Sequence, residues 1–351
     1  LLLCSDQWTN KLVNTDGILC TGVFIAPPRT AATTFEMTIL PLTDQLPLFP
    51  FSLLFFAVVF LLTIRPTRIV DIIGKFLTPL LIVGILGLIV AGILHPLGPI
   101  GEAVSPHIAQ DGILAGYQAM DILSVAGFSI VVQDNLRRRG CQDQRSLLGA
   151  TIGTACVAGV LLILIYGGLT YLGATASTVL DHSLNQTQLI VAITHQLLGR
   201  TGVVVLGLVV GCACLTTSVG LFGATASYFE RVLHVPYRVG ICILSVIGVA
   251  ICNLGLSSII SAATPVLSIL CPPFMTTVLL LLFRTKIKHT ALYKGAALGA
   301  VIASGIITLS TSLYPLPFVR FLPLYSFGFG WLLPAVVGGL LGVLLAGRRA
   351  R

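Results

Sequence analysis

Charged residues are scarce in this sequence, and this limits the classes of protein that it can encode. Only 9% of its 351 residues are charged, whereas a typical soluble domain has about 25%. A soluble protein of this length needs a charged surface, which 20 basic and 12 acidic side chains do not provide. The shortage excludes a soluble enzyme, a nucleic-acid-binding protein and a disordered chain.

Groups that enzymes use for catalysis are also sparse. The six His and nine Cys residues are scattered, and their spacing fits neither a metal site nor a disulfide framework. A membrane enzyme would need clustered carboxylates or histidines at a membrane face. A phosphate-binding glycine loop is missing as well, so ATP-driven activity would require another subunit. We therefore expect no enzymatic activity and no bound cofactor.

Long apolar runs are what the sequence has instead. Hydrophobic residues make up 56% of the chain, as in a protein whose outer surface faces lipid. Ten apolar segments are long enough, or nearly so, to cross a bilayer as helices. They are 18–40, 48–64, 74–95, 112–132, 147–173, 201–228, 237–253, 265–283, 292–313 and 327–346. We predict an all-α polytopic membrane protein with a transmembrane domain at 18–346, between a polar stretch at 1–17 and a basic tail at 347–351.

The segments between the apolar runs differ in their content of Lys and Arg. Every second segment, from 65–75 to the tail at 347–351, is basic, and together these hold sixteen Lys and Arg residues. The alternate segments hold only Arg200 and Arg320. Because basic loops stay on the cytoplasmic side, we place the carboxyl terminus in the cytoplasm. The net charge of +8 reflects membrane topology and not a nucleic-acid partner.

Polar residues interrupt the first predicted span, 18–40. Pro27 and Pro28 remove two backbone donors, so we expect a broken or kinked helix. Arg29 falls near the centre of the span, where a charge is costly unless it is paired or faces a cavity. Glu36 lies two turns further on the same face, and the two charges form either a structural ion pair or part of a polar pathway. Hydroxyls along such a pathway would come from Thr30, Thr33 and Thr34.

An acid lies at the midpoint of the span predicted at 112–132. An Asp in the middle of a bilayer indicates a functional site, and this one is Asp121. Gly116 and Gly127 weaken the helix on either side, which favours an unwound segment at Asp121 that offers backbone groups to a substrate or ion. The alternative is an Asp that is protonated or hydrogen-bonded to a neighbouring helix.

Three consecutive hydroxyls lie within the span predicted at 201–228, on Thr216, Thr217 and Ser218. Such hydroxyls often donate to the carbonyl one turn earlier, and composition alone favours this structural interpretation. The alternative is a small-cation site in which two hydroxyls and the Ala213 carbonyl supply oxygen ligands.

Three stretches of the sequence resemble one known family. They are 28–37 (PRTAATTFEM), 116–121 (GYQAMD) and 213–217 (ACLTT), and shorter likenesses accompany them in the family's order. The stretches are similar to the branched-chain amino acid permeases, which import leucine, isoleucine and valine with sodium. The likeness covers most of the chain from residue 26 to residue 283.

The resemblance implies a fold. Members of the family are thought to share the LeuT-like inverted-repeat helical bundle, with twelve spans and cytoplasmic termini. By this register ten spans are present of the expected twelve, so that 18–40 is the third, 112–132 the sixth and 201–228 the eighth. The sixth span of such folds is discontinuous and holds the substrate. The resemblance also implies a location in the plasma (inner) membrane of a bacterium.

The resemblance further implies roles for individual residues. An Ala-x-x-Thr/Ser-Thr/Ser sodium motif in the eighth span is matched by Ala213, Thr216 and Thr217. Arg29 and Glu36 form a structural or coupling ion pair in this interpretation. The residues expected to bind substrate lie in the third and sixth spans. They are Thr30, Thr33, Gly116, Tyr117, Met120, Asp121 and Ser124.

The function that these observations predict is sodium-coupled uptake of branched-chain amino acids by alternating access. Sodium is the co-transported ion, and proton coupling through Asp121 or Glu36 is the alternative. The expected partners are the amino-acid substrate and membrane lipid, without a nucleic acid or an obligate protein partner.

One part of the family pattern has no counterpart in the sequence. The family's first span is a Gly-Asn-Leu-Ile-Phe-Pro-Pro type segment, which is missing, and 1–17 does not resemble the second span. In the family the first span should complete the sodium site and capture the substrate carboxylate. We therefore expect either a fragment or a truncated gene product that does not transport alone.

Overall fold

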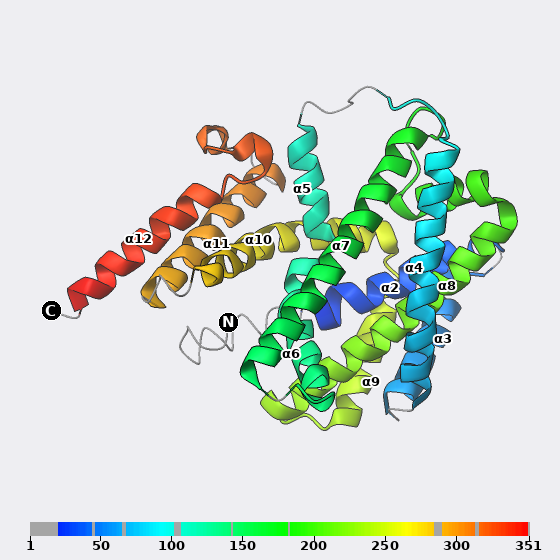
Figure 1. The fold of residues 1–351 in the computed structure, drawn as a ribbon, viewed down its shortest axis with the longest axis horizontal. Helices are drawn as coiled ribbons and strands as arrows, with labels where there is room; N and C mark the ends of the chain where they lie inside the picture. Colours follow the sequence, from blue (N-terminus) through cyan, green and yellow to red (C-terminus); the bar gives the residue numbers. More distant parts are fainter. Residues whose placement is uncertain are drawn as a thin grey trace. The chain divides into compact units, whose positions relative to one another are not determined.

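The computed structural model describes most of the chain. The residues described are 20–43, 46–64, 68–101, 107–141, 143–181, 183–283, 290–312 and 316–349. Their regular structure is entirely helical, without a β-strand in these ranges (Figure 1). Two compact units are formed, one of residues 22–102 and 132–259, and the other mainly of 103–131 and 260–351.

Several of the helices have the length and composition of membrane spans. Among the described residues, four helices are long and apolar enough to cross a bilayer. They are α7 (Gln144–Ala176), α8 (Gln186–Val232), α10 (Leu256–Leu282) and α11 (Thr290–Ser312). Shorter apolar helices cover 48–64, 78–94, 237–252 and 332–346. The chain is a polytopic membrane protein, and the regular structure of its described residues is all helical.

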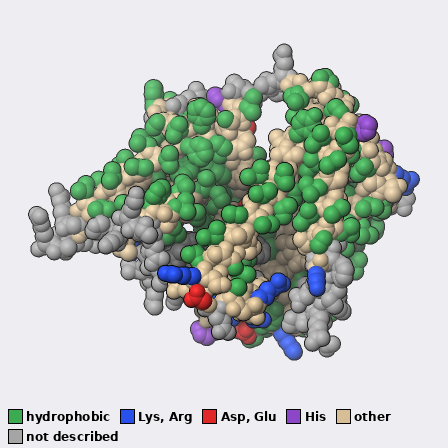
Figure 2. Space-filling model, viewed as in Figure 1, with side chains coloured by type: hydrophobic (Ala, Val, Ile, Leu, Met, Phe, Trp, Pro, Cys, Tyr) green, Lys and Arg blue, Asp and Glu red, His purple; other side chains and the backbone are tan. Residues whose placement is uncertain are grey.

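Apolar side chains lie on the outside of the protein as well as inside. Figure 2 shows hydrophobic side chains over most of the visible face, with Lys, Arg, Asp and Glu in only a few places. In the most apolar 18-residue stretch of α7, 0% of the residues are buried, and Ile163 in this helix is 74% exposed. Soluble monomers rarely expose apolar surface on this scale, whereas lipid accommodates it.

The helix α8 is central to the unit formed by 22–102 and 132–259. It contacts α2 (Ala26–Thr34), α3 (Leu48–Ile64), α4 (Arg68–Leu94), α7 and α9 (Tyr237–Cys252). Phe56 of α3 stacks on Phe222 of α8 with 5.8 Å between the ring centroids, and both rings are buried.

A sharp bend divides α8 at Gly199. The backbone there has φ 67° and ψ −168°, a conformation that glycine adopts without the steric cost of a side chain. The helix therefore consists of an arm at 186–198 and a long part at 200–232. The arm begins with a capping box, in which the side chains of Asn185 and Gln188 each accept a hydrogen bond from the other residue's backbone.

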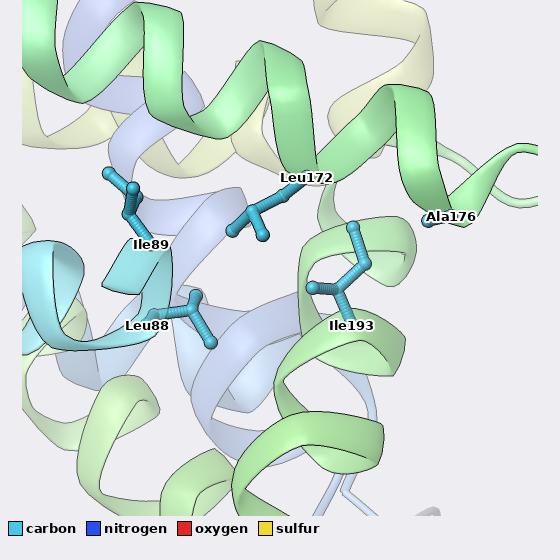
Figure 3. Close-up of a cluster of buried hydrophobic side chains, with 5 residues drawn as sticks. All are labelled: Leu88, Ile89, Leu172, Ala176 and Ile193. Atoms are coloured by element: carbon cyan, nitrogen blue, oxygen red, sulfur yellow. The ribbon is translucent and has the colours of Figure 1, made fainter. Parts of the chain in front are cut away.

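A cluster of buried apolar side chains holds the arm in place (Figure 3). Leu88 and Ile89 of α4 pack there with Leu172 and Ala176 of α7 and with Ile193 of the arm. The contact joins the consecutive helices α7 and α8 to α4, which is distant in sequence, so the arm has a defined position within its unit.

The first predicted span is a continuous helical segment in which the hydrogen-bonding pattern changes. A π-helical turn, η1 (Cys20–Ile25), leads into α2, and a second one, η2 (Phe35–Ile39), follows it. Pro27 and Pro28 lie in the first turn of α2, where their missing N–H groups cost little. The helix therefore does not break at the prolines. The hydrogen bonding changes there from π-helical to α-helical.

The unit formed mainly by 103–131 and 260–351 contains the remaining helices. They are α5 (Ile108–Gln118), the start of α6 (Asp121–Arg138), most of α10, α11, the short turns η3 (Pro317–Phe321) and η4 (Tyr325–Phe327), and α12 (Leu332–Arg349). The backbones of α11 and α12 touch, because a Cβ atom on Gly295 would overlap the carbonyl group of Gly338. Small residues permit this close approach in membrane helices.

We predict that Gly295→Ala lowers the melting temperature of the purified protein, because the added methyl group overlaps the backbone of α12. The control is Gly305→Ala on the same helix, where a Cβ atom meets nothing within 4 Å. This control should leave the melting temperature unchanged or raise it, since Ala favours a helix over Gly by about 1 kcal/mol. Thermal unfolding in detergent measures both, and equal effects would contradict the close α11–α12 contact.

Candidate functional site

Hydroxyl groups connect α2 and η2 to α8. Thr38 donates to the Gly207 carbonyl at 2.7 Å, and the Thr30 and Ser218 hydroxyls lie 2.7 Å apart. Thr30 also donates to the Pro27 carbonyl at 2.8 Å. Because Thr30 has a single hydroxyl proton, Ser218 is the donor in the Thr30–Ser218 bond. Thr30 therefore lies at a polar contact between antiparallel helices, in which Ser218 is fully buried.

The neighbouring threonines of α2 have different surroundings. Thr34 is buried and donates to the Thr30 carbonyl at 2.8 Å. Thr33 is half-buried. Thr30, one of the predicted substrate residues, therefore lies at the contact between α2 and α8. Its partner Ser218 was not among the residues predicted to bind a ligand.

The three residues of the predicted sodium motif lie together on α8. Thr216 and Thr217 both donate to the Ala213 carbonyl, at 2.9 Å and 2.8 Å respectively. These are the bonds expected if the hydroxyls serve only to satisfy the helix. They also bring three oxygen atoms together on one turn of α8. A cation could use these oxygens only after both hydroxyl protons turn away from the carbonyl. Among the described residues, no three His, Cys, Asp or Glu side chains form a metal-binding group.

The helix break predicted near Asp121 is present, one residue earlier. The helix α5 ends at Gln118, and α6 begins at Asp121. Met120 between them has φ 62°, a left-handed conformation that costs a non-glycine residue about 1–2 kcal/mol. Asp121 consequently lies in the first turn of α6, where a negative charge is favoured by the helix dipole.

Glycines do not form the break. Gly116 lies within α5 with open space around it, and the backbone of Gly127 belongs to α6. The structural disturbance is instead at Ala119 and Met120, whose amides donate to the carbonyls of Gly116 and Tyr117 at 3.2 Å. The side chain of Ser124, another predicted substrate residue, lies outside the described residues.

Tyr117 and the residue after it have hydrogen-bond partners elsewhere in their unit. Its hydroxyl accepts a hydrogen bond from the indole N–H of Trp331 at 3.1 Å, and both side chains are buried. The next residue, Gln118, donates to the Thr264 hydroxyl of α10 at 3.1 Å. Tyr117, Thr264 and Trp331 line a cavity of about 580 Å³. The site residues predicted from sequence include neither Thr264 nor Trp331, because nothing in their local sequence indicates these pairings.

The two charges of the first predicted span are Arg29, which is half-buried, and Glu36. The Glu36 carboxylate accepts hydrogen bonds from the Asn185 amide at 3.1 Å and from the Thr187 hydroxyl. Glu36 therefore fixes the start of the α8 arm. An ion pair between Arg29 and Glu36 stays a prediction.

Comparison with known proteins identifies the family. The family model described as "Branched-chain amino acid transport protein" matches residues 5–349. The chain belongs to this family. It is 32% identical to the branched-chain amino acid permease BrnQ of Bacillus subtilis (strain 168) over 342 residues, which cover 93% of this chain and 78% of the relative.

Other relatives have the same kind of description. The permease BrnQ of Escherichia coli (strain K12) is 34% identical over 335 residues, with 93% of this chain and 76% of the relative covered. The "Branched-chain amino acid transport system 2 carrier protein" of Pseudomonas aeruginosa is 33% identical over 337 residues, with 93% and 77% covered. The family resemblance seen in the sequence is thus confirmed, and the family consists of transport proteins and not of enzymes.

Proposed function

We propose that this protein carries leucine, isoleucine and valine into a bacterial cell by sodium-coupled alternating access. The family match over residues 5–349 is the observation that carries the substrate class. The charge bias of the loops supports a position in the plasma membrane with a cytoplasmic carboxyl terminus. The partners are then the amino acid and membrane lipid.

The substrate site in this proposal surrounds the break between α5 and α6. Gly116, Tyr117, Met120 and Asp121 contribute from these helices, together with Ser124 of α6. Thr30 and Thr33 of α2 belong to the other unit, and their part in substrate binding stays a prediction from the family resemblance. A substrate ammonium group is suited to the Asp121 carboxylate and to the carbonyl end of α5, where the helix dipole is negative. Broken helices serve in this way at the midplane sites of inverted-repeat transporters. The break therefore supports the LeuT-like fold with twelve spans, which is part of the proposal.

The sodium site in this proposal is the oxygen cluster of Ala213, Thr216 and Thr217. Carbonyl and hydroxyl oxygens are suitable ligands for a small hard cation. These three atoms fill only part of a coordination shell, so further oxygens from the protein or from water must complete it. Proton coupling through Asp121 or Glu36 is the second candidate, since both carboxylates belong to the regions that the proposal uses.

We predict that Thr216→Ala and Thr217→Ala each raise the sodium concentration needed for half-maximal leucine uptake by about tenfold or more. Each substitution removes one charge-assisted oxygen contact to the cation. The measurement is the sodium dependence of leucine uptake by cells that express the chain together with the family's first two spans, with the amount of protein in the membrane quantified.

The matched control is Thr154→Ala in α7, whose hydroxyl donates to the Ala150 carbonyl at 2.8 Å in the same local geometry. It should leave the sodium dependence unchanged. Unaltered sodium activation in both α8 variants would rule out the cation site and leave only the structural hydrogen bonds.

We predict that Asp121→Asn reduces leucine uptake by at least about tenfold while the protein still inserts in the membrane. The amide keeps the side-chain volume and removes the charge that would bind the substrate ammonium group. Asp143→Asn, which alters an exposed acid before α7, is the control and should transport normally. Wild-type uptake by Asp121→Asn over a broad pH range would show that the carboxylate is only structural.

A further inference from the structure

A cavity of about 640 Å³ lies where the arm of α8 meets the end of η2. We call it the arm cavity. Its walls are Glu36, the segment 40–42, one face of the arm and the first turns after the bend at Gly199. All of these residues belong to one compact unit. The volume falls in the range of about 300–1,000 Å³ that is usual for small-molecule sites.

The wall formed by the arm is one face of a helix whose opposite face is packed. Gln188, Val191 and His195 line the cavity at the three- and four-residue spacing of one helix face. The opposite face packs against the apolar cluster of Figure 3 through Leu189, Ile190, Ile193 and Leu197. One face of the arm is thus held by buried contacts, which leaves the other available to a ligand.

A carboxylate is fixed in the cavity. Both hydrogen bonds that Glu36 accepts, from Asn185 and Thr187, go to Oε2. The second oxygen, Oε1, takes part in neither of these bonds. Because Glu36 is half-buried and oriented by two donors, it presents a defined negative charge to the cavity.

A guanidinium group lies in the same cavity. Arg200 follows the bend directly and lines the cavity from the long part of α8. In the part of the chain that the structure describes, it forms neither a hydrogen bond nor an ion pair with another residue. A guanidinium group binds a carboxylate in bidentate geometry, which suits it to an anionic group of a ligand.

Apart from Gln188, His195 and Gln196 of the arm, the rest of the lining is apolar. Leu40, Val191, Val203 and Val204 contribute aliphatic side chains to the cavity. A simple anion would be repelled by Glu36, and a simple cation by Arg200. A ligand with both charges and an aliphatic side chain satisfies all three parts of the lining.

We propose that the arm cavity is a second amino-acid site, which binds a zwitterionic α-amino acid with a branched aliphatic side chain. The ammonium group donates to Glu36 Oε1, Arg200 binds the carboxylate, and the side chain lies against the valines. The residues are ones that the proposed transport site does not include. The charge bias of the loops predicts that this end of α8 is outside the cell, so the site captures substrate before transport. The choice of ligand rests on the proposed function.

The test is equilibrium binding of labelled L-leucine to the purified protein in lipid nanodiscs. We expect two leucine molecules per chain at saturation. Arg200→Gln and Glu36→Gln should each weaken one of the two by at least about tenfold, the loss expected when one charge-assisted contact is removed. Arg145→Gln at the start of α7 and Glu230→Gln near the end of α8 are matched controls that do not line the cavity.

Two leucine analogues identify which charge each residue binds. Leucinamide lacks the carboxylate, and Arg200→Gln should bind it at the cavity as well as it binds leucine. The acid 4-methylpentanoate lacks the ammonium group, and Glu36→Gln should no longer discriminate against it. If Glu36→Gln unfolds the arm, Arg200→Gln still tests the proposal. In the described structure the Arg200 guanidinium forms no bond whose loss would destabilise the fold.

Each alternative result has a separate meaning. One leucine per chain, bound equally by the wild type and both variants, would overturn the arm-cavity proposal and leave the proposed function intact. Preference of the cavity for a leucine dipeptide over leucine would overturn the ligand class. Complete lack of leucine binding would overturn both proposals.

Discussion

Lipid offers no hydrogen-bond partners, and this constraint governs where the chain can leave the helical conformation. Within the described residues, helical segments are interrupted at Gly199 and at Ala119–Met120. Arg200 follows the first interruption and Asp121 the second. Backbone groups released from a helix in a membrane need polar neighbours or a cavity, which accounts for Asp121 beside the second interruption. Gly199 belongs to a segment predicted to lie outside the membrane. Both proposed amino-acid sites are built at such interruptions.

The same constraint explains the behaviour of the hydroxyl groups. Thr216, Thr217 and Thr264 each donate to a carbonyl of their own helix, so these hydroxyls are satisfied without a ligand. Thr38 instead donates across to the Gly207 carbonyl of α8. Thr30 donates to the Pro27 carbonyl of its own helix and accepts from Ser218 of α8. A hydroxyl that already donates within its own helix adds little free-energy cost in a membrane, because it is not left unsatisfied. An ion must displace that bond, which makes the Ala213 cluster suitable for reversible binding.

The amino-acid sequence predicts much of the fold, because apolar runs of sufficient length have few alternatives to a membrane helix. It also predicts the break near Asp121 to within one residue, although the glycines that motivated the prediction lie inside helices. The left-handed Met120 has no local signal. The Asn185–Gln188 capping box is readable from the sequence and marks the start of the arm. The pairings of Tyr117 with Trp331 and of Glu36 with Thr187 arise only from tertiary contacts, so sequence patterns do not reveal them.

The central claim is that leucine and sodium cross the membrane together, and flux of labelled sodium tests it most directly. Membrane vesicles from cells that express the gene are loaded without sodium and exposed to labelled sodium with and without leucine. Sodium-coupled transport predicts that external leucine accelerates sodium entry, and that an inward sodium gradient drives leucine accumulation above its external concentration. Leucine entry of equal rate and extent when choline replaces sodium, without leucine-dependent sodium entry, would contradict it.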